Sequence, residues 1–176
     1  MFTALLLATL AVAGAPTPAG LHAGLAGHWK GSLGYRDYQS DRLFELPVTS
    51  EFRMVPDGVS EVTVSAFDDG PKAGKVYITS LSLFDVNAGT LISTSFRRGQ
   101  KPDLETQNVA VTEYRDPTHW TLTYEATATD GDQPARLRIT ETREGDALLS
   151  VKEAAPLSPP NAALRFRNQT RLVKVR

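Results

Sequence analysis

The sequence contains no cysteine among its 176 residues. Disulfides and thiolate metal sites are therefore excluded, as is the lipid anchor of bacterial lipoproteins, which needs a cysteine at its cleavage site. An excess of charge of one sign is also absent, because 19 basic and 20 acidic residues leave a formal net charge of −1. We therefore expect no general electrostatic attraction to nucleic acid or to anionic lipid.

A long apolar run is missing from the body of the chain, where nothing approaches the roughly 20 residues that cross a bilayer. The N-terminus differs, because residues 2–12 read FTALLLATLAV, about the length of the apolar segment of a secretory signal. No Lys or Arg precedes this run, so an uncleaved membrane anchor or a buried helix stays open as an alternative. We expect a signal peptide over residues 1–19 and no transmembrane segment in the mature protein.

The cleavage site of this signal is open among three alanines. Cleavage after Ala13 satisfies the small-x-small rule with Ala11. Cleavage after Ala15 would place Pro16 next, which signal peptidases handle poorly, and cleavage after Ala19 is also possible. Export without disulfides is typical of bacteria rather than of a eukaryotic secretory pathway, where small domains are often cross-linked. The sequence therefore predicts a periplasmic or secreted bacterial protein.

Beyond the signal, residues 20–26 predict a short N-terminal tail and residues 27–176 predict one β domain. In this domain apolar residues recur with period two, β-branched and aromatic residues are frequent, and turn residues return every ~8–12 positions. Strands are expected over residues 29–35, 44–54, 59–67, 76–84, 90–96, 108–115, 119–128, 136–143, 147–153 and 164–175.

About ten strands joined by short connections favour consecutive antiparallel hairpins. Closing such a sheet removes its two edges, so the predicted fold is all-β, a single antiparallel up-and-down β-barrel. An immunoglobulin-like sandwich is the alternative, which the strand count and the lack of long crossover connections disfavour. A barrel of this size has room inside for side chains or for one small ligand.

Glycines surround a tryptophan at the start of the first strand, which reads G-H-W-K-G from Gly27. We expect Trp29 to plug one end of the barrel while the glycines let the strand bend around it. With Gly27 and Trp29 the sequence resembles lipocalin-like (calycin-type) barrels, whose first strand carries a G-x-W signature. The resemblance implies that an arginine of the last strand stacks on the tryptophan, with Arg165, Arg167 and Arg171 as candidates.

The two ends of the domain also resemble a group of small secreted bacterial proteins whose function is not established. These pair a W-x-G-x-L-x-Y-x-D-Y-Q-S start, matched from Trp29 to Ser40, with an F-R-N ending, matched from Phe166 to Asn168. The resemblance implies a fold and supplies no activity. Residues 35–42 of this start are polar and aromatic, and we interpret them as a solvated turn or, alternatively, as a loop at the barrel mouth that contacts a ligand.

Three histidines are present, and no paired spacing among them predicts a metal site. His119 is the best candidate for catalysis or haem ligation, because histidine titrates near neutral pH. It alternates out of phase with Trp120, so we expect it on the outer surface; His28 has the same relation to Trp29, and His22 lies in the expected tail. No nucleophile elbow, P-loop or dinucleotide fingerprint occurs. No catalytic residue and no cofactor are therefore predicted.

Three functions are compatible with such a barrel. The first is an exported binding protein that holds one small, largely apolar ligand inside, and this is the function we predict. Its expected lining comprises Trp29, Tyr35, Phe44, Leu46, Trp120, Tyr124 and Phe166. The second is a structural or partner-binding barrel with a filled interior. The third is an enzyme, which would need a buried titratable group with a perturbed pKa. The oligomeric state is left open.

Overall fold

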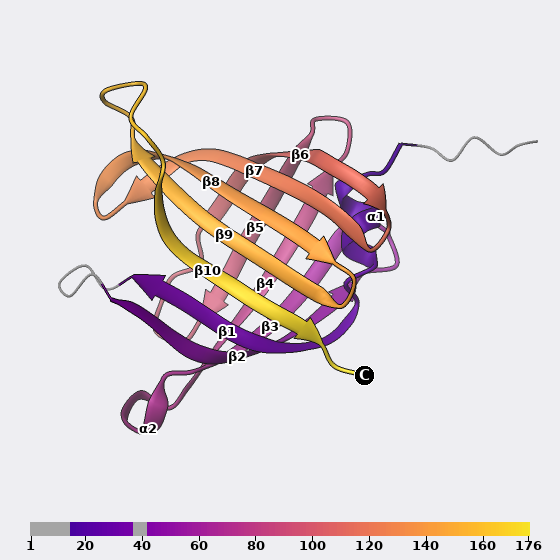
Figure 1. The fold of residues 1–176 in the computed structure, drawn as a ribbon, viewed down its shortest axis with the longest axis horizontal. Helices are drawn as coiled ribbons and strands as arrows, with labels where there is room; N and C mark the ends of the chain where they lie inside the picture. The colour runs from indigo at the N-terminus through magenta and orange to yellow at the C-terminus, as the bar shows by residue number, and fades with distance from the viewer. Residues whose placement is uncertain (1–14, 37–41) are drawn as a thin grey trace, which may run out of the picture.

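The computed structural model describes residues 15–36 and 42–176 (Figure 1). The expected signal peptide falls largely on residues 1–14, and part of the polar loop falls on residues 37–41; both segments lie outside the described residues. The described chain forms two short helices, α1 (Pro18–Ala23) and α2 (Gly70–Ala73), and the strands β1 (Gly27–Arg36), β2 (Leu43–Met54), β3 (Ser60–Asp68), β4 (Lys75–Asp85), β5 (Thr90–Arg97), β6 (Leu104–Asp116), β7 (His119–Asp130), β8 (Gln133–Glu144), β9 (Ala147–Pro156) and β10 (Arg165–Lys174).

The strands form one closed antiparallel barrel (Figure 1). Each strand pairs with its neighbours in sequence, and the first strand, β1, pairs with the last, β10. The prediction of a single up-and-down β-barrel of about ten strands is confirmed. The prediction rested on the regular alternation of apolar and polar residues, because a period of two is typical of a strand with two different faces.

The seam between β1 and β10 depends on close approach of the two backbones. The register runs from Trp29 opposite Lys174 to Tyr35 opposite Asn168. A Cβ atom at Gly31 would overlap the backbone carbonyl of Arg171 on the facing strand. Only glycine therefore fits at this point of the seam without moving the partner strand.

Short aspartate turns connect the strands at the end of the barrel where α1 lies. Asp57 accepts hydrogen bonds from the N–H groups of Val59 and Ser60 at 3.0 and 2.8 Å. Asp85 accepts in the same way from Asn87 and Ala88 at 3.0 and 2.9 Å. The role of each carboxylate is therefore to cap its own turn.

Helix α1 closes this end of the barrel, as Figure 1 shows. Thr17 caps it by accepting a hydrogen bond from the N–H of Gly20 at 3.1 Å, and Pro18 begins it with a φ suited to the first turn. Residues 20–26, which were expected to form a tail, thus contribute to the barrel: Leu21 and Leu25 are buried. No helix of the described chain has the length and apolar content to cross a bilayer.

The main hydrophobic core lies under α1. Its largest fully buried side chains are Leu25, Trp29, Trp120 and Leu122. The indole N–H of Trp29 donates to the carbonyl of Leu25 at 2.7 Å, which ties β1 to the segment after α1. The expected plug of one barrel end is therefore a tryptophan together with a helix.

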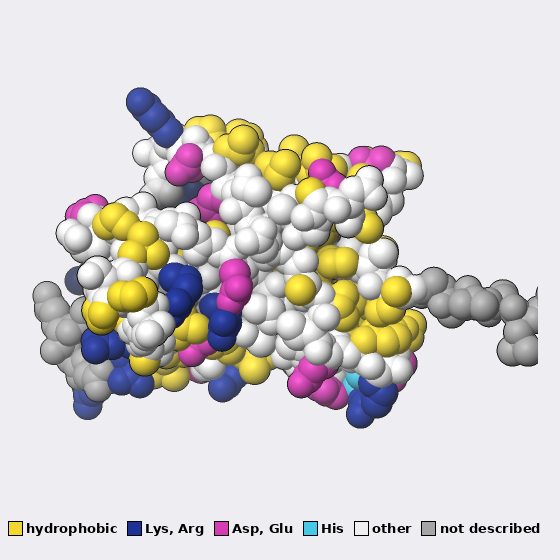
Figure 2. All heavy atoms as spheres, turned by 90° about the horizontal axis from the view of Figure 1, so that it is seen from above, with side chains coloured by type: hydrophobic (Ala, Val, Ile, Leu, Met, Phe, Trp, Pro, Cys, Tyr) yellow, Lys and Arg dark blue, Asp and Glu magenta, His cyan; other side chains and the backbone are white. Residues whose placement is uncertain are grey.

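On the face seen from above, acidic and basic side chains are scattered among uncharged and apolar surface, with several basic side chains close together at the lower left (Figure 2). On strands β3 to β6, several apolar side chains point outward from the barrel. These are Val64, Tyr77, Leu81, Leu83, Phe96 and Leu104, which are between 37% and 70% exposed.

Candidate functional site

The α1 helix carries His22 into the interior of the barrel. The side chain is 8% exposed, and it meets three polar residues that come from β3, β7 and β8. Its Nδ1 lies 3.1 Å from Oε2 of Glu61, and its Nε2 lies 2.9 Å from Oε1 of Glu141 and 2.8 Å from the hydroxyl of Tyr124. These four side chains form the buried cluster that we call the His22 cluster.

Further bonds complete the His22 cluster. The hydroxyl of Tyr124 donates to Oε1 of Glu141 at 3.2 Å, and the hydroxyl of Thr63 donates to Oε1 of Glu61 at 3.2 Å. Two aromatic rings flank the imidazole: Phe84 at a centroid distance of 4.9 Å and Trp120 at 6.2 Å. The polar cluster is therefore bordered by aromatic side chains. In these apolar surroundings the low dielectric constant strengthens each charge interaction.

The geometry requires a proton on both ring nitrogens of His22, because each nitrogen faces a carboxylate oxygen that only accepts hydrogen bonds when ionised. Burial alone would disfavour the imidazolium, but the negative charges and hydrogen bonds of Glu141 and Glu61 outweigh it. The pKa of His22 is raised from the ordinary 6.5 to about 10. Burial, and then the charges of Glu141 and Glu61, raise the pKa of Tyr124 well above 10, so the phenol stays neutral.

The cluster is structural in one respect, because it anchors α1 to three strands. Both nitrogens of His22 are engaged by these side chains, and no group of three metal-ligating side chains suited to an ion occurs within residues 15–36 and 42–176. A protonated imidazole is a hydrogen-bond donor only, so it cannot coordinate a cation.

An internal cavity of about 180 Å³ lies against the cluster. Five of its lining residues are apolar and five carry a hydroxyl or carboxylate; they are Val48, Phe52, Phe67, Leu148 and Leu172, and Ser50, Ser65, Ser150, Thr170 and Glu141. The hydroxyls of Ser50 and Ser65 are 2.8 Å apart across β2 and β3. Glu141 is thus shared between the His22 cluster and the cavity.

The inner wall is polar at β3 and β4. On these two strands several polar side chains face the interior of the barrel, and several apolar side chains face outward. Glu61 is buried, whereas its apolar neighbour Val64 on the other face of β3 is 37% exposed. The register places Ser82 opposite Glu61 and Ser80 opposite Thr63, so all four share the inner face. The barrel therefore holds a hydroxyl-rich lumen and shows apolar residues to the outside on these strands.

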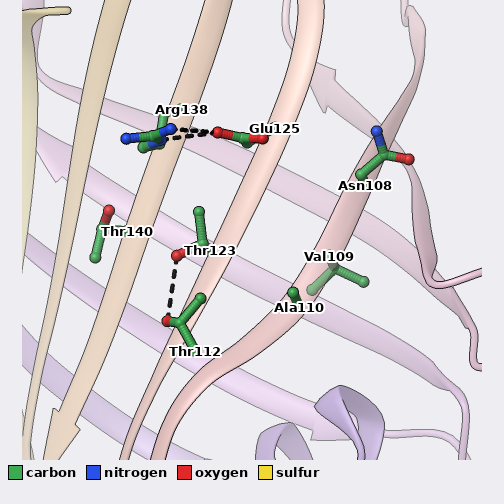
Figure 3. Close-up of a pocket in the computed structure, with 8 residues that line it drawn as sticks. All are labelled: Asn108, Val109, Ala110, Thr112, Thr123, Glu125, Arg138 and Thr140. Carbon is green, nitrogen blue, oxygen red and sulfur yellow. Dashed lines mark hydrogen bonds and ion pairs between the residues drawn. The ribbon is translucent and has the colours of Figure 1, made fainter.

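A larger depression, of about 430 Å³, lies on the outer wall over β6, β7 and β8 (Figure 3). Arg138 and Glu125 form an ion pair across it at 2.6 Å, and the hydroxyls of Thr112 and Thr123 are 3.3 Å apart. The register between β6 and β7 shifts after Val111, and this bulge separates the strands. Because Arg138 and Glu125 are both more than 40% exposed, we take this depression as a consequence of the bulge.

None of the seven residues predicted to line a ligand site lines the internal cavity. Trp29, Trp120 and Tyr124 fill the closed end under α1, and Leu46 packs against the core. At the opposite end the rings of Tyr35 and Phe44 stack at 6.1 Å and are 38% and 47% exposed.

Phe166 was expected inside and lies on the outer face. A register shift between Phe166 and Asn168 places Phe166 opposite Glu153, which alternates with the inner-facing Ala154 and is thus on the outer wall. A bulge inserts one residue and reverses the alternation of faces beyond it, which no periodicity in the sequence reveals.

The cations next to Trp29 also differ from the expected ones. Arg143 of β8 and Lys174 of β10 lie 6.0 and 5.5 Å from the ring centroid. Arg171 was expected to stack on Trp29. It lies opposite Ser32 instead, on the other face of the sheet from Trp29. Gly27 has a φ of +115°, a conformation that favours glycine and that lets β1 bend before the tryptophan.

The remaining candidates for the stack on Trp29 lie at the far end. Arg167 forms an ion pair with Asp130 at 2.6 Å, at the end of the barrel opposite α1, and Arg165 is exposed. A cation at the end of the last strand is nevertheless present, in the form of Lys174. The residue of β10 nearest the ring is thus a lysine and not one of these three arginines.

The two other histidines are at the surface. His28 is 70% exposed. His119 contacts Asp116 at 2.8 Å in the turn between β6 and β7, and hydrogen bonds from Thr118 and His119 hold the pKa of Asp116 well below its ordinary value. His119, the best candidate from the sequence, therefore belongs to a local turn, whereas His22 was missed.

Comparison with known proteins supports the fold alone. No protein-family model matches the chain, and no curated protein matches its sequence. The barrel is similar to a solved structure. The crystal structure of Rv2717c from M. tuberculosis superimposes with a TM-score of 0.62, covering 90% of this chain and 98% of that one. At 15% sequence identity this similarity to Rv2717c shows a shared architecture, and it carries no statement about activity.

Proposed function

We propose that the protein binds one small molecule inside its barrel, in the cavity beside Glu141. The observation that carries this proposal is the cavity itself, which is lined entirely by inner-facing side chains of β2, β3, β8, β9 and β10. A dry engineered cavity of about 150 Å³ binds benzene, so a space of about 180 Å³ is sufficient for a molecule of roughly six to ten non-hydrogen atoms.

The lining makes the ligand amphipathic rather than largely apolar. The apolar side chains of Val48, Phe67 and Leu172 alternate on their strands with hydroxyls, and Glu141 adds one carboxylate. A few polar groups set among apolar ones are typical of small-molecule sites, where the polar groups fix the orientation. The polar inner face of β3 and β4 extends this character along the lumen.

Export is part of the proposal and rests on the apolar segment at residues 2–12. The fold favours cleavage after Ala13 or Ala15 over cleavage after Ala19, because the last would remove Thr17 and Pro18, which begin α1. Mass spectrometry of the protein from a periplasmic or culture fraction would give the N-terminal residue; a start at residue 14 or 16 is expected, and an uncleaved chain in the cytosol would contradict export.

Native mass spectrometry of the protein purified from its own host tests the binding function. We expect a stoichiometric adduct with the mass of a small molecule. In Ser150→Leu, the larger side chain fills the cavity, and the adduct should disappear while the circular dichroism spectrum is kept. The matched control is Thr123→Leu, which enlarges a side chain of the outer depression and should keep the adduct. An adduct that survives Ser150→Leu would contradict the proposed site.

A second candidate function is partner binding by the outer wall. The exposed apolar residues on β3 to β5 support it, because Ala66 lies opposite Tyr77 and Thr79 lies opposite Phe96, which places Tyr77 and Phe96 on the same outer face. Cross-linking in the host tests this function. If the protein carries no adduct, and if a cross-linked partner is lost in the Tyr77→Glu variant, partner binding is favoured over ligand binding.

A further inference from the structure

The wall of the internal cavity contains one carboxylate oxygen without a hydrogen-bond partner. Oε1 of Glu141 receives bonds from His22 and Tyr124, whereas Oε2 receives none from any described residue. The Glu141 side chain is 12% exposed and lines the cavity, and no lysine or arginine shares that lining. Because the side chain lines the cavity and this oxygen accepts no hydrogen bond from the described residues, it is available to a donor from a ligand.

Two hydroxyls beside Glu141 are also unpartnered among the described residues. The register places Glu141 opposite Ser150 and Ser150 opposite Thr170, so the three side chains follow one another across β8, β9 and β10. Neither hydroxyl forms a hydrogen bond to another part of the described chain, and both line the cavity. Three acceptors therefore stand in a row on one wall.

The His22 cluster carries an excess of one negative charge. The imidazolium of His22 supplies one positive charge, and the carboxylates of Glu61 and Glu141 supply two negative charges. Tyr124 is neutral, and Arg143, at the closed end, donates to the carbonyls of Gly145 and Pro117. The cluster thus favours a further positive charge beside Glu141, since charges in an interior are stable only when they are paired.

Lys152 is the other cation of the inner wall near this site. The register places it opposite Ile139 and Asn168, two residues beyond Ser150 toward the end opposite α1. It forms no ion pair with Glu141 and does not line the cavity. The excess charge at the cavity is therefore not neutralised by direct contact within the described chain.

We infer that the ligand is a small organic cation with a primary ammonium group, and that Glu141 is its counter-ion. This inference rests on the proposed function. The ammonium donates one hydrogen bond to Oε2 of Glu141 and its other two to the hydroxyls of Ser150 and Thr170. The organic part lies along Val48, Phe67 and Leu172. Three donors meeting three acceptors leave no N–H unsatisfied, which is the condition for stable burial of a lysine-like group.

Isothermal titration calorimetry with three probes of similar shape tests this inference. Benzylamine is cationic, benzyl alcohol is neutral and benzoate is anionic at neutral pH. We expect benzylamine to bind at least about tenfold more tightly than either of the others, the difference that a charge-assisted hydrogen bond supports. In Glu141→Gln, benzylamine should lose at least about tenfold in affinity, while benzyl alcohol changes little.

A matched variant controls for the general effect of removing a carboxylate. Glu125→Gln makes the same change on the outer wall, where Glu125 pairs with the exposed Arg138, and it should leave the affinity for benzylamine unchanged. Thermal unfolding of each variant checks that the barrel is retained. The comparison of probes on the unmodified protein needs no variant, so it decides the question even if Glu141→Gln fails to fold.

The outcomes separate the inference from the proposed function. If benzyl alcohol or benzoate binds as tightly as benzylamine, the ammonium inference is overturned and the binding function stands. If no probe binds but the host protein carries an adduct, a neutral or anionic adduct overturns the inference and a cationic one supports it. If no probe binds and no adduct exists, both are overturned.

Discussion

His22 and His119 face carboxylates at similar distances, yet they occupy opposite environments. His119 lies 2.8 Å from Asp116, three residues away in the same turn, and its side chain is 29% exposed. His22 lies 2.9 Å from Glu141 and 3.1 Å from Glu61, which are distant from it in the sequence and belong to β8 and β3. The His22 side chain is 8% exposed. Distance alone does not distinguish the two contacts; burial and the number of opposing charges do.

The difference decides how much each contact contributes to stability. In the turn, water screens the pair and the neighbouring hydroxyl of Thr118 already holds Asp116 at 2.7 Å. In the interior, each member of the His22 cluster depends on the others, because a lone charge there has no water to replace its partner. A histidine that looks unremarkable in the sequence is therefore the one that the fold depends on.

Removal of the His22 side chain should have the largest effect. In His22→Ala the carboxylates of Glu61 and Glu141 lose their cation in the interior, so the free energy of unfolding should fall by about 3–5 kcal/mol. Urea unfolding followed by tryptophan fluorescence measures this loss. A loss below about 1 kcal/mol would show that the cluster is no more important than a surface pair.

The pH dependence of stability should separate the two histidine sites by sign. The pKa of folded His22 is raised above the ordinary 6.5 to about 10, so its stabilisation is fully present below about pH 6.5 and is lost as the pH rises through about 10. The pKa of Asp116 is lowered, so its stabilisation is present above about pH 3.8 and is lost as the pH falls further.

Urea unfolding between about pH 2 and pH 10 measures this profile. We expect the free energy of unfolding to decline from about pH 7 toward pH 10, and we expect the decline to be absent in His22→Ala. Tyr124, whose pKa is raised, adds to the decline only above its ordinary value of 10. An unchanged alkaline profile in the variant would assign the decline to other groups.

The smallest effect is expected at the turn. His119→Ala removes one partner of Asp116, which keeps its bonds to the hydroxyl and the N–H of Thr118 at 2.7 and 2.8 Å. The free energy of unfolding should therefore change by less than about 1 kcal/mol in the urea assay. A larger loss than that of His22→Ala would reverse the comparison between the two sites.

The sequence was sufficient for the fold because local patterns determine it. Alternation identified each strand, and aspartate and glycine turns marked the hairpins, as at Asp57 and Asp85. The same alternation misplaced Phe166, because the bulge in β10 reverses the faces. It also left the polar lumen unforeseen, since Val64 and Leu81 face outward on β3 and β4 while serines face inward.

The site was beyond sequence reasoning for a different reason. The partners of His22 lie 39, 102 and 119 residues away, at Glu61, Tyr124 and Glu141, and no spacing rule joins such positions. One signal was present: Thr17 followed by Pro18 is a typical helix start, and it argues for a folded segment where a tail was expected. What the helix buries becomes visible only when the barrel is closed.

The glycine seam has a consequence for the order of folding. Since β1 pairs with β10, the contact between Gly31 and Arg171 forms only after the whole chain is available, and such long-range pairing is slow. Until then the growing sheet has two unpaired edges, which are sites for aggregation. The lumen that holds Glu141 is therefore among the last parts of the molecule to be enclosed, and an intermediate without the seam would have strands but no binding site.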